Sequence, residues 1–311
     1  MSSFPFPVDP QLTGVVIAYQ NAELIADRVL PRIGPPLTRQ TFRYMKFDFA
    51  QSVTVPETRV GRKGEPNEVE FGGTELDAST LDYGLDDVVP IDDVKNAPAG
   101  YNPLTYAAQG VMDLVLLDRE KRVADLVFNA ATYPAANKET LSGTAQWSDA
   151  ASDPIGDIQD ARDGMIMSPN ILVLGRATWT MLRRHPKIVS SLSGSGTTSG
   201  VASLQAVTDL LELDEIVIGN AWVNTARKGQ PTSLARTWGK HAALLRRDTL
   251  STSLNQRPSF GATFQYDTRV AGQIPEPKAG LRGAIRVRAG ESVKELITAA
   301  DLGYFFQNAV A

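Results

Sequence analysis

The stretch that decides the fold begins with an asparagine and a proline and reads Asn102-Pro-Leu-Thr-Tyr-Ala-Ala-Gln-Gly-Val-Met-Asp-Leu-Val-Leu-Leu-Asp-Arg-Glu-Lys-Arg-Val-Ala-Asp-Leu-Val127. Asparagine suits the N-cap of a helix, and proline suits the first helical position. Apolar residues then recur at helical spacing and form one stripe, made of Ala108, Met112, Val115, Leu116, Val123, Leu126 and Val127. Arg119 interrupts this stripe. The pattern predicts one helix that runs to Pro134 and is about 40 Å long.

Two alternating runs precede this helix and predict a long hairpin. Phe42 and Tyr44 alternate with Arg43 and Met45 in the first run, and the second run covers 74–83. If the second run returns antiparallel to the first, the stretch between them is the far end of the hairpin. The charged residues of that far end are Glu57, Arg59, Arg62, Lys63, Glu65, Glu68 and Glu70. Because such a hairpin has little core of its own, we expect these residues to contact a neighbouring subunit.

The first forty residues give weaker signals. Residues 1–10 contain three prolines without periodicity, which predicts an extended arm. Asn21 suits the N-cap of a short helix over 22–30, which would end before Pro31.

After a polar connection at 135–152, the pattern alternates between helix and strand. Asp153 and Pro154 repeat the cap-and-proline signal of a helix start. The expected strands or extended runs are 170–174, 215–218, 236–245 and 259–266, and the further expected helices are 177–184 and 203–213. Two last extended runs, 284–288 and 302–306, could pair with the region around the long helix. The architecture is therefore α+β, without a visible internal repeat.

Composition excludes several classes of function. The chain has 311 residues and no cysteine, which removes disulfides, thiolate nucleophiles and cysteine-ligated metals. A formal net charge of −4 argues against a dedicated nucleic-acid binder, because neutralising phosphates requires a basic surface. No apolar run approaches the roughly 20 residues needed to cross a bilayer.

The candidates for site chemistry are few. Of the two histidines, His185 lies in the basic run 183–187 and is interpreted as a solvated helix end, with an anion-binding patch as the alternative; His241 is interpreted as structural. The loop 193–200 lacks the lysine of a phosphate-binding loop. An acidic cluster favours a solvated turn over a site for a hard cation, and it consists of Asp82, Asp86, Asp87, Asp92 and Asp93. An arginine row predicts a solvent face, with a subunit contact or a DNA-facing row as alternatives, and it consists of Arg282, Arg286 and Arg288. We predict no catalytic, cofactor-binding or metal-binding residue.

The order of these elements, together with several short phrases, resembles a known family. The phrases are Thr58-Arg-Val-Gly-Arg62, Val69-Glu-Phe-Gly72, Asp82-Tyr-Gly-Leu-Asp-Asp87, Asn96-Ala-Pro-Ala-Gly-Tyr101, Leu117-Asp-Arg-Glu120, Trp238-Gly-Lys-His-Ala-Ala-Leu-Leu245, Ile274-Pro-Glu-Pro-Lys278 and Gly303-Tyr-Phe-Phe306. They are similar to the major capsid proteins of tailed bacteriophages with the Hong Kong ninety-seven type of fold, especially those of transposable phages.

The resemblance implies a division of the chain. Residues 1–40 would be an N-terminal arm and 41–83 an extended loop. Residues 84–150 would form a peripheral domain around the long, or spine, helix, to which the C-terminal strands of 270–311 return. Residues 151–269 would form an axial domain.

The resemblance also implies a function without enzymatic activity. Copies of the chain would assemble as pentamers and hexamers into an icosahedral shell around phage DNA, in the bacterial cytoplasm, and remain in the virion. The implied partners are a separate scaffolding protein, a portal, a decoration protein where one is present, and packaged double-stranded DNA through non-specific contacts, with no membrane and no cofactor. One alternative is an encapsulin-like shell around a cargo enzyme. Another is a small-molecule enzyme that uses residues 151–269.

Overall fold

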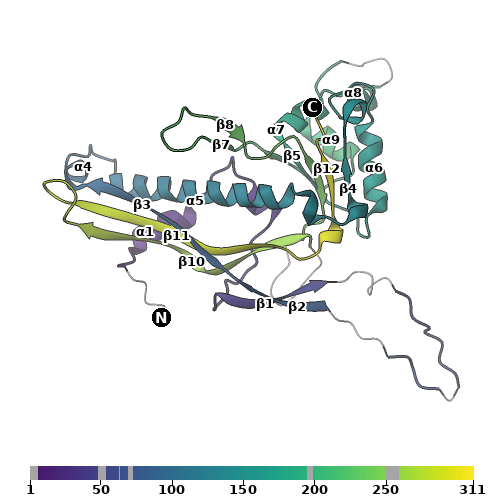
Figure 1. Ribbon diagram of the computed structural model, residues 1–311, viewed down its shortest axis with the longest axis horizontal. Helices are drawn as coiled ribbons and strands as arrows, with labels where there is room; N and C mark the ends of the chain where they lie inside the picture. The colour runs from purple at the N-terminus through teal and green to yellow at the C-terminus, as the bar shows by residue number, and fades with distance from the viewer. Residues whose placement is uncertain (1–5, 48–53, 63, 69–72, 195–198, 249–258) are drawn as a thin grey trace.

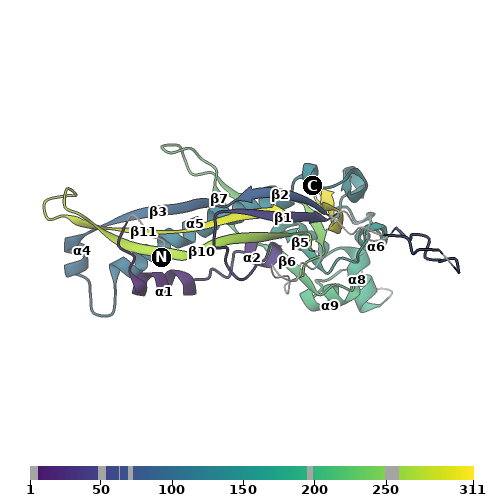
Figure 2. The ribbon, with the colours of Figure 1, turned by 90° about the horizontal axis from the view of Figure 1, so that it is seen from below.

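The computed structural model describes residues 6–47, 54–62, 64–68, 73–194, 199–248 and 259–311. A long helix lies along a sheet of long strands, an α/β block stands at one end of that layer, and a hairpin projects below the block (Figure 1). The view from below shows the same elongated shape, with helix α1 near the N-terminal end of the described chain (Figure 2).

The long helix α5 spans Pro103–Val127, and its predicted start is confirmed. The Asn102 side chain accepts hydrogen bonds from the backbone N–H groups of Leu104 and Thr105, at 3.0 and 3.4 Å. The helix ends earlier than predicted, because Phe128 closes it and Asn129 starts a separate 3₁₀ turn over Ala130–Thr132. Short 3₁₀ turns also occur at Ala135–Asn137, Gly143–Ala145 and Ala300–Leu302.

Helix α5 packs on an antiparallel sheet with the order β10–β11–β3. These strands are β10 (Gly261–Glu276), β11 (Ala284–Ile297) and β3 (Leu81–Pro90). Their shared core includes Met112 and Val115 from the helix and Ala271, Val287 and Ala289 from the sheet, all buried. The predicted strand 284–288 is therefore confirmed and is longer than expected. The prediction of a solvated turn at 82–93 is wrong, because most of that run is strand β3, followed by helix α4 (Ile91–Lys95).

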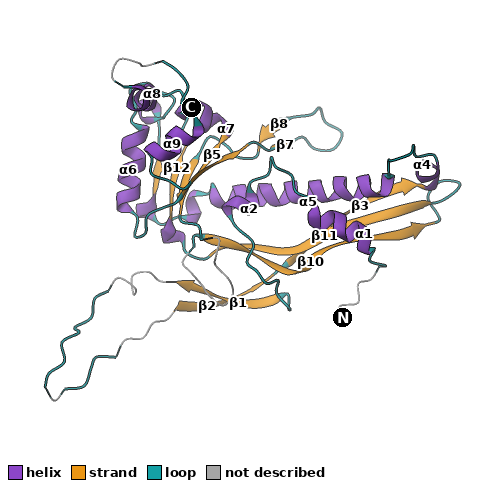
Figure 3. Cartoon of the chain, turned by 180° about the vertical axis from the view of Figure 1, so that it is seen from behind, coloured by secondary structure: helices purple, strands orange, loops and turns teal. Residues whose placement is uncertain are grey.

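The N-terminal segment becomes helical where the predicted extended arm, 1–10, ends. Helix α1 covers Pro10–Ala18, and the Asp9 carboxylate caps it by accepting from the backbone N–H of Gln11 at 2.8 Å. Helix α2 is only Ala26–Val29, so the predicted helix over 22–30 is confirmed in part. Before α1 and after α2 the chain follows the outer edge of β10 through isolated bridges, which protect that edge from other pairing (Figure 3).

The α/β block is built on a five-stranded sheet with the order β4–β12–β9–β5–β6. Its strands are β4 (Lys138–Thr140), β12 (Gly303–Gln307), β9 (Ala242–Leu245), β5 (Ile171–Gly175) and β6 (Glu215–Gly219). Its helices are α6 (Pro154–Gly164), α7 (Arg176–Leu182), α8 (Pro186–Ser193) and α9 (Leu204–Leu210). The expectation that 302–306 pairs beside the long helix is wrong, because β12 belongs to the sheet of the α/β block, where it pairs with β9 and β4. Leu302 and Phe305 nevertheless share a core with Val123 and Val127 at the end of α5.

Two short hairpins leave this body. Strands β1 (Thr41–Phe47) and β2 (Gly73–Ser79) pair antiparallel from Thr41↔Ser79 to Phe47↔Gly73, which confirms the predicted return of the second run along the first. Strands β7 (Trp222–Asn224) and β8 (Leu234–Arg236) form the other hairpin, above α5 in Figure 1.

Candidate assembly surfaces

The tip of the hairpin formed by β1 and β2 projects from the body (Figure 3). Of the predicted contact residues, Glu57, Arg59, Arg62, Glu65 and Glu68 are exposed, whereas the charged residues at positions 63 and 70 (Lys63 and Glu70) lie outside the described residues. Within the described part of the tip, neither arginine forms an ion pair with any of these glutamates. The contacts that shape the tip are local, such as the 3.0 Å bond from the Arg59 backbone N–H to Glu57 Oε1. The charged groups of the tip are therefore available to another molecule.

The base of the same hairpin is held by aromatic packing. The Phe42 ring stacks on Phe264 of β10, with centroids 4.6 Å apart, and the Tyr44 ring lies 6.4 Å from Phe264. Arg43 also pairs with Glu75 and Asp77 across the hairpin, but these ion pairs are exposed and each contributes only about 0–1 kcal/mol. The aromatic contacts fix where the tip leaves the body.

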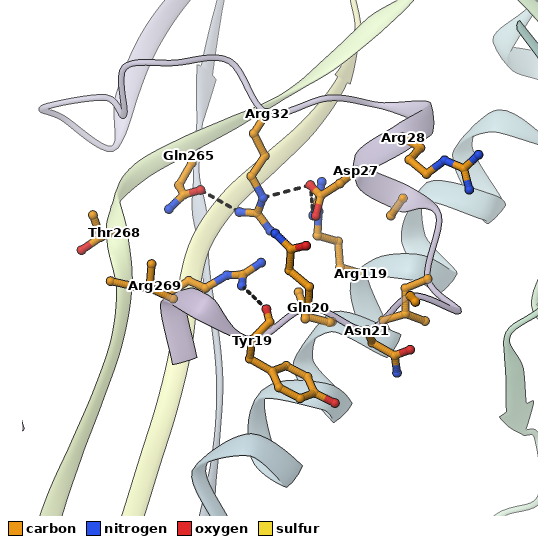
Figure 4. A pocket seen from close by; sticks show the side chains of 15 residues that line it. Tyr19, Gln20, Asn21, Asp27, Arg28, Arg32, Arg119, Gln265, Thr268 and Arg269 are labelled. Atoms are coloured by element: carbon orange, nitrogen blue, oxygen red, sulfur yellow. Dashed lines mark hydrogen bonds and ion pairs between the residues drawn. The ribbon is translucent and has the colours of Figure 1, made fainter. Parts of the chain in front are cut away.

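A charge network joins the N-terminal segment to the helix and the sheet; Arg119 and Glu291 are buried in it, whereas Asp27 is half-exposed. The network lines a cavity of about 720 Å³, in which the guanidinium groups of Arg32 and Arg119 both approach Asp27 (Figure 4). Arg119 Nη1 lies 2.6 Å from Asp27 Oδ1, and Arg32 Nε lies 2.9 Å from the same oxygen. Partial burial raises the pKa of Asp27, but these two guanidinium groups outweigh that effect and hold it below its ordinary value. Glu291, fully buried on β11, accepts from Arg32 at 2.8 Å and from Arg269 at 3.1 Å.

Glu120 lies where three parts of the chain meet. Its buried carboxylate accepts from Trp238 Nε1 at 2.6 Å and from the backbone N–H groups of Ile25 and Ala26 at 3.0 and 2.7 Å. These donors come from the loop before β9 and from the start of α2. Burial raises the pKa of Glu120, more than the three donors lower it. This one side chain therefore ties the N-terminal segment and the α/β block to the long helix.

The arginine row and the acidic cluster are largely partners of each other. Arg288 binds Asp86 through two bonds of 2.7 Å, and Arg286 lies 3.3 Å from the same carboxylate. The hydrogen bonds from Arg288, more than the opposing desolvation, hold the pKa of Asp86 below its ordinary value. Arg282 pairs with Asp92 at 2.9 Å. The arginines therefore lie on a solvent-exposed face, as predicted, but each is paired with a carboxylate.

His185 is buried, so the prediction of a solvated helix end is also wrong. Its Nδ1 accepts from the backbone N–H of Lys187 at 3.3 Å, which caps helix α8. The proton is thereby assigned to Nε2, which lies 3.0 Å from the Asp149 carbonyl oxygen and 3.1 Å from Ser152 Oγ. A protonated Nε2 cannot act as a base toward Ser152. The Ser152–His185 contact is therefore structural.

His241 is also structural. Its Nδ1 accepts from the backbone N–H of Asn308 at 2.9 Å, and its ring packs against Phe128 and Phe305. Burial lowers its pKa. Among the residues that the structure describes, no three metal-binding side chains gather at one point, and no helix is long and apolar enough to span a bilayer.

Comparison with known proteins shows the family of the chain. The family described as "Phage major capsid protein E" matches residues 106–233. The major capsid protein of Pseudomonas phage JBD67 is 54% identical over 311 residues, which is the whole of both chains. The chain belongs to the phage major capsid proteins. The major capsid protein of Burkholderia phage BcepMu is 27% identical and aligns over 96% of this capsid protein and 95% of its own length.

Solved structures agree on the fold. A phage-related protein from Bordetella bronchiseptica RB50 has a TM-score of 0.76 and 23% identity, over 98% of this capsid protein and 99% of the other chain. The SrpI encapsulin of Synechococcus elongatus has a TM-score of 0.51 and 8% identity, over 94% and 90% of the two chains. The capsid protein therefore has the Hong Kong ninety-seven type of fold. Because the encapsulin likeness shows the fold alone, the encapsulin alternative loses its support. The protein is a non-enzymatic component of the virion that forms the phage head shell.

Sequence reasoning missed Glu120 and the charge network of this capsid protein. The signal was visible, because Arg119 and Glu120 interrupt the apolar face of a long helix. Ionic groups in such a place are rarely left unpaired, since an isolated buried charge is costly. Their partners come from segments that are distant in the sequence, which spacing along one helix does not reveal.

Proposed function

We propose that the hairpin tip, residues 54–68, is an intersubunit loop through which one capsid protein binds a neighbouring copy in the shell. One observation carries this proposal: the described charged side chains of the tip are exposed and lack ion pairs with each other, although its base is fixed on β10. Two apolar side chains of the tip are exposed as well, Val55 at 88% and Val60 at 46%. A segment with so few internal contacts gains little from its own subunit, so its stabilisation would come from the neighbour.

The contact residues proposed for this intersubunit contact are six charged residues of the tip together with Glu70, which follows the tip; the six are Glu57, Arg59, Arg62, Lys63, Glu65 and Glu68. Exposed ion pairs each contribute about 0–1 kcal/mol, but a shell repeats every contact at each equivalent interface, so small terms add up. Salt at 0.1 M screens exposed charges over about 10 Å, so assembly that depends on these ion pairs should be sensitive to the salt concentration.

The test replaces residues 58–66 with a short Gly/Ser turn. We expect the unassembled subunit to unfold within a few degrees of the wild type, whereas closed shells disappear in electron micrographs. The matched control shortens the loop 226–232 between β7 and β8 in the same way. If the variant with the shortened tip still forms normal shells, or if its isolated subunit unfolds, the tip is not an intersubunit loop.

Reversing the charges at Arg59, Arg62 and Lys63 tests the electrostatic part separately. Shell formation should weaken, and the size of the effect should depend on salt concentration because the tip groups are exposed. An effect of the same size at low and high salt would mean that the charges of the tip do not contribute.

We further propose the division of the chain into an arm (1–40), an extended loop (41–83), a peripheral domain (84–150 with the strands after 270) and an axial domain (151–269). The pairing of β12 with β9 supports moving residues 303–307 from the peripheral to the axial part. The finer partners proposed from the family are a scaffolding protein, a portal, a decoration protein and packaged DNA. Purifying assembly intermediates and identifying the associated chains tests them.

A further inference from the structure

The turn between β10 and β11, residues 277–283, presents an apolar side chain at the far end of the long sheet. Leu281 is 98% exposed, and the neighbouring Lys278 and Arg282 are exposed too. Gly280 and Gly283 have φ angles of +62° and +83°. Residues with a side chain rarely adopt such φ angles, so the shape of this turn depends on glycine. We call residues 278–282 the knob.

A hollow of about 430 Å³ opens at the same end of the molecule, between the end of β3, helix α4 and the start of α5. Its most prominent side chains are Tyr101 and Tyr106, whose ring centroids lie 5.9 Å apart and which are 47% and 66% exposed. Several prolines add rigid apolar surface, namely Pro90, Pro98 and Pro103. The carboxylates of Asp87 and Asp93 also line the hollow.

The knob and the hollow have opposite charge. Among the residues that the structure describes, neither Asp87 nor Asp93 forms an ion pair, and Lys278 forms none either. Arg282 has an ion pair with Asp92, but both side chains remain largely exposed, at 66% and 43%. An apolar knob with cationic flanks therefore matches an aromatic hollow with free carboxylates in polarity and in charge.

The two features do not meet within one copy. The turn that carries the knob is tied to α4, where the Ile91 backbone N–H donates to the Gly283 carbonyl at 3.1 Å and Asp92 pairs with Arg282, and none of residues 278–282 lines the hollow. Leu281 stays almost fully exposed even though an aromatic hollow lies nearby. Since the protein assembles into a shell, other copies of both features are always close at hand.

We propose that Leu281 of one capsid protein inserts between Tyr101 and Tyr106 of a second copy, with Lys278 facing Asp87 and Asp93. Each copy gives a knob and receives one, so the contact is heterologous and links the far ends of the sheets of successive copies. Burying an exposed leucine against aromatic rings supplies the apolar part of the contact. The contact is separate from the hairpin tip and does not depend on it.

The absence of cysteine from the chain allows a direct test. Leu281→Cys protein and Tyr106→Cys protein are mixed, assembled under reducing conditions and treated with a short bis-maleimide, which tolerates wider spacing than a disulfide does. Denaturing electrophoresis should show covalent dimers. The matched control replaces the Tyr106→Cys protein with Val201→Cys protein, because Val201 is also exposed, at 56%, and does not line the hollow.

Covalent dimers that form with position 106 and not with position 201 support the proposal. Assembly that fails with Leu281→Cys or Tyr106→Cys, although these subunits fold and the Val201→Cys protein assembles, also supports it. Shells that assemble with no more 281–106 dimers than 281–201 dimers overturn it and favour another occupant of the hollow. Because the hairpin tip is unchanged in all these proteins, that result does not bear on the proposed role of the tip as an intersubunit loop.

A charge exchange gives a second measurement. Lys278→Glu should lower the yield of shells about tenfold or more, because like charges at an interface are strongly unfavourable. Adding Asp87→Lys and Asp93→Lys to the same chain should restore the yield. If the combined variant is as defective as the more defective of its parents, Lys278 does not face these carboxylates.

Discussion

Removing the Glu120 carboxylate should destabilise the unassembled subunit strongly. Glu120→Ala leaves the indole N–H of Trp238 and the backbone N–H groups of Ile25 and Ala26 buried without an acceptor. Each unsatisfied donor costs about 1–3 kcal/mol, while the loss of a desolvated carboxylate returns part of that, so we expect a decrease in the free energy of unfolding of roughly 3–5 kcal/mol. Urea unfolding followed by circular dichroism measures it.

A double-mutant cycle isolates the shortest of these bonds, the 2.6 Å bond from Trp238. Glu120→Ala, Trp238→Phe and the double variant should give a coupling of about 1.5–3 kcal/mol, the range for a hydrogen bond to a charged group. Asp125→Ala is the matched control on the same helix, since its 2.6 Å pair with Lys121 is exposed and should contribute less than about 1 kcal/mol. A Glu120–Trp238 coupling below about 0.5 kcal/mol would refute the view that this bond joins the α/β block to the helix.

Three further outcomes are expected for the isolated subunit. Gly219→Ala should lower its melting temperature severely or prevent folding, because the added Cβ would lie 2.1 Å from the Trp238 ring, and a thermal melt measures this. His185→Ala should cost about 1–3 kcal/mol in urea unfolding, because it uncaps α8 and leaves buried polar groups unpaired; an unchanged midpoint would contradict the buried position of this histidine. The pKa of Asp27 is held below its ordinary value of 3.8, so its contribution to stability is present above that pH and is lost as the pH falls through the lower folded value. Asp27→Asn should therefore be less stable at neutral pH and lose less stability on acidification, and equal losses in a pH series of urea midpoints would exclude this role.

Local signals in the sequence predicted the elements that depend on local chemistry. The Asn102 cap with proline after it located the start of α5, and the alternation around Phe42 located the hairpin. The same cap signal occurs at Asp9, with Pro10 at the first helical position, where proline is favourable. Because the predicted extended arm, 1–10, included both residues, the sequence reasoning did not locate the start of helix α1.

The charged residues were harder to place, because their partners are distant in the sequence. Asp86 was assigned to a solvated turn, although Arg286 and Arg288 neutralise it from the adjacent strand about 200 residues later. His185 looked solvated among its basic neighbours, yet the turn near Asp149 covers it. Periodicity along one segment cannot report such pairings, because they depend on which strands become neighbours. For the same reason, the sequence located the exposed hairpin tip but not the hollow beside Tyr106.

The register shift between β10 and β11 has a mechanical consequence. The sixteen residues of β10 extend over about 50 Å, from the core of the α/β block to the knob; helix α1 packs against β10 itself, and α5 packs on the neighbouring strands β11 and β3. The regular pairing of β10 with β11 is interrupted between Tyr266 and Val270, where Asp267 has a φ of +53°. An irregularity of this kind bends a strand and increases its twist. The bend of the long sheet therefore lies at residues 267–269, where Arg269 also binds Glu291 and the carbonyl oxygens of Val16 and Tyr19, so a change in the curvature of the shell wall at this point would also act on the N-terminal segment.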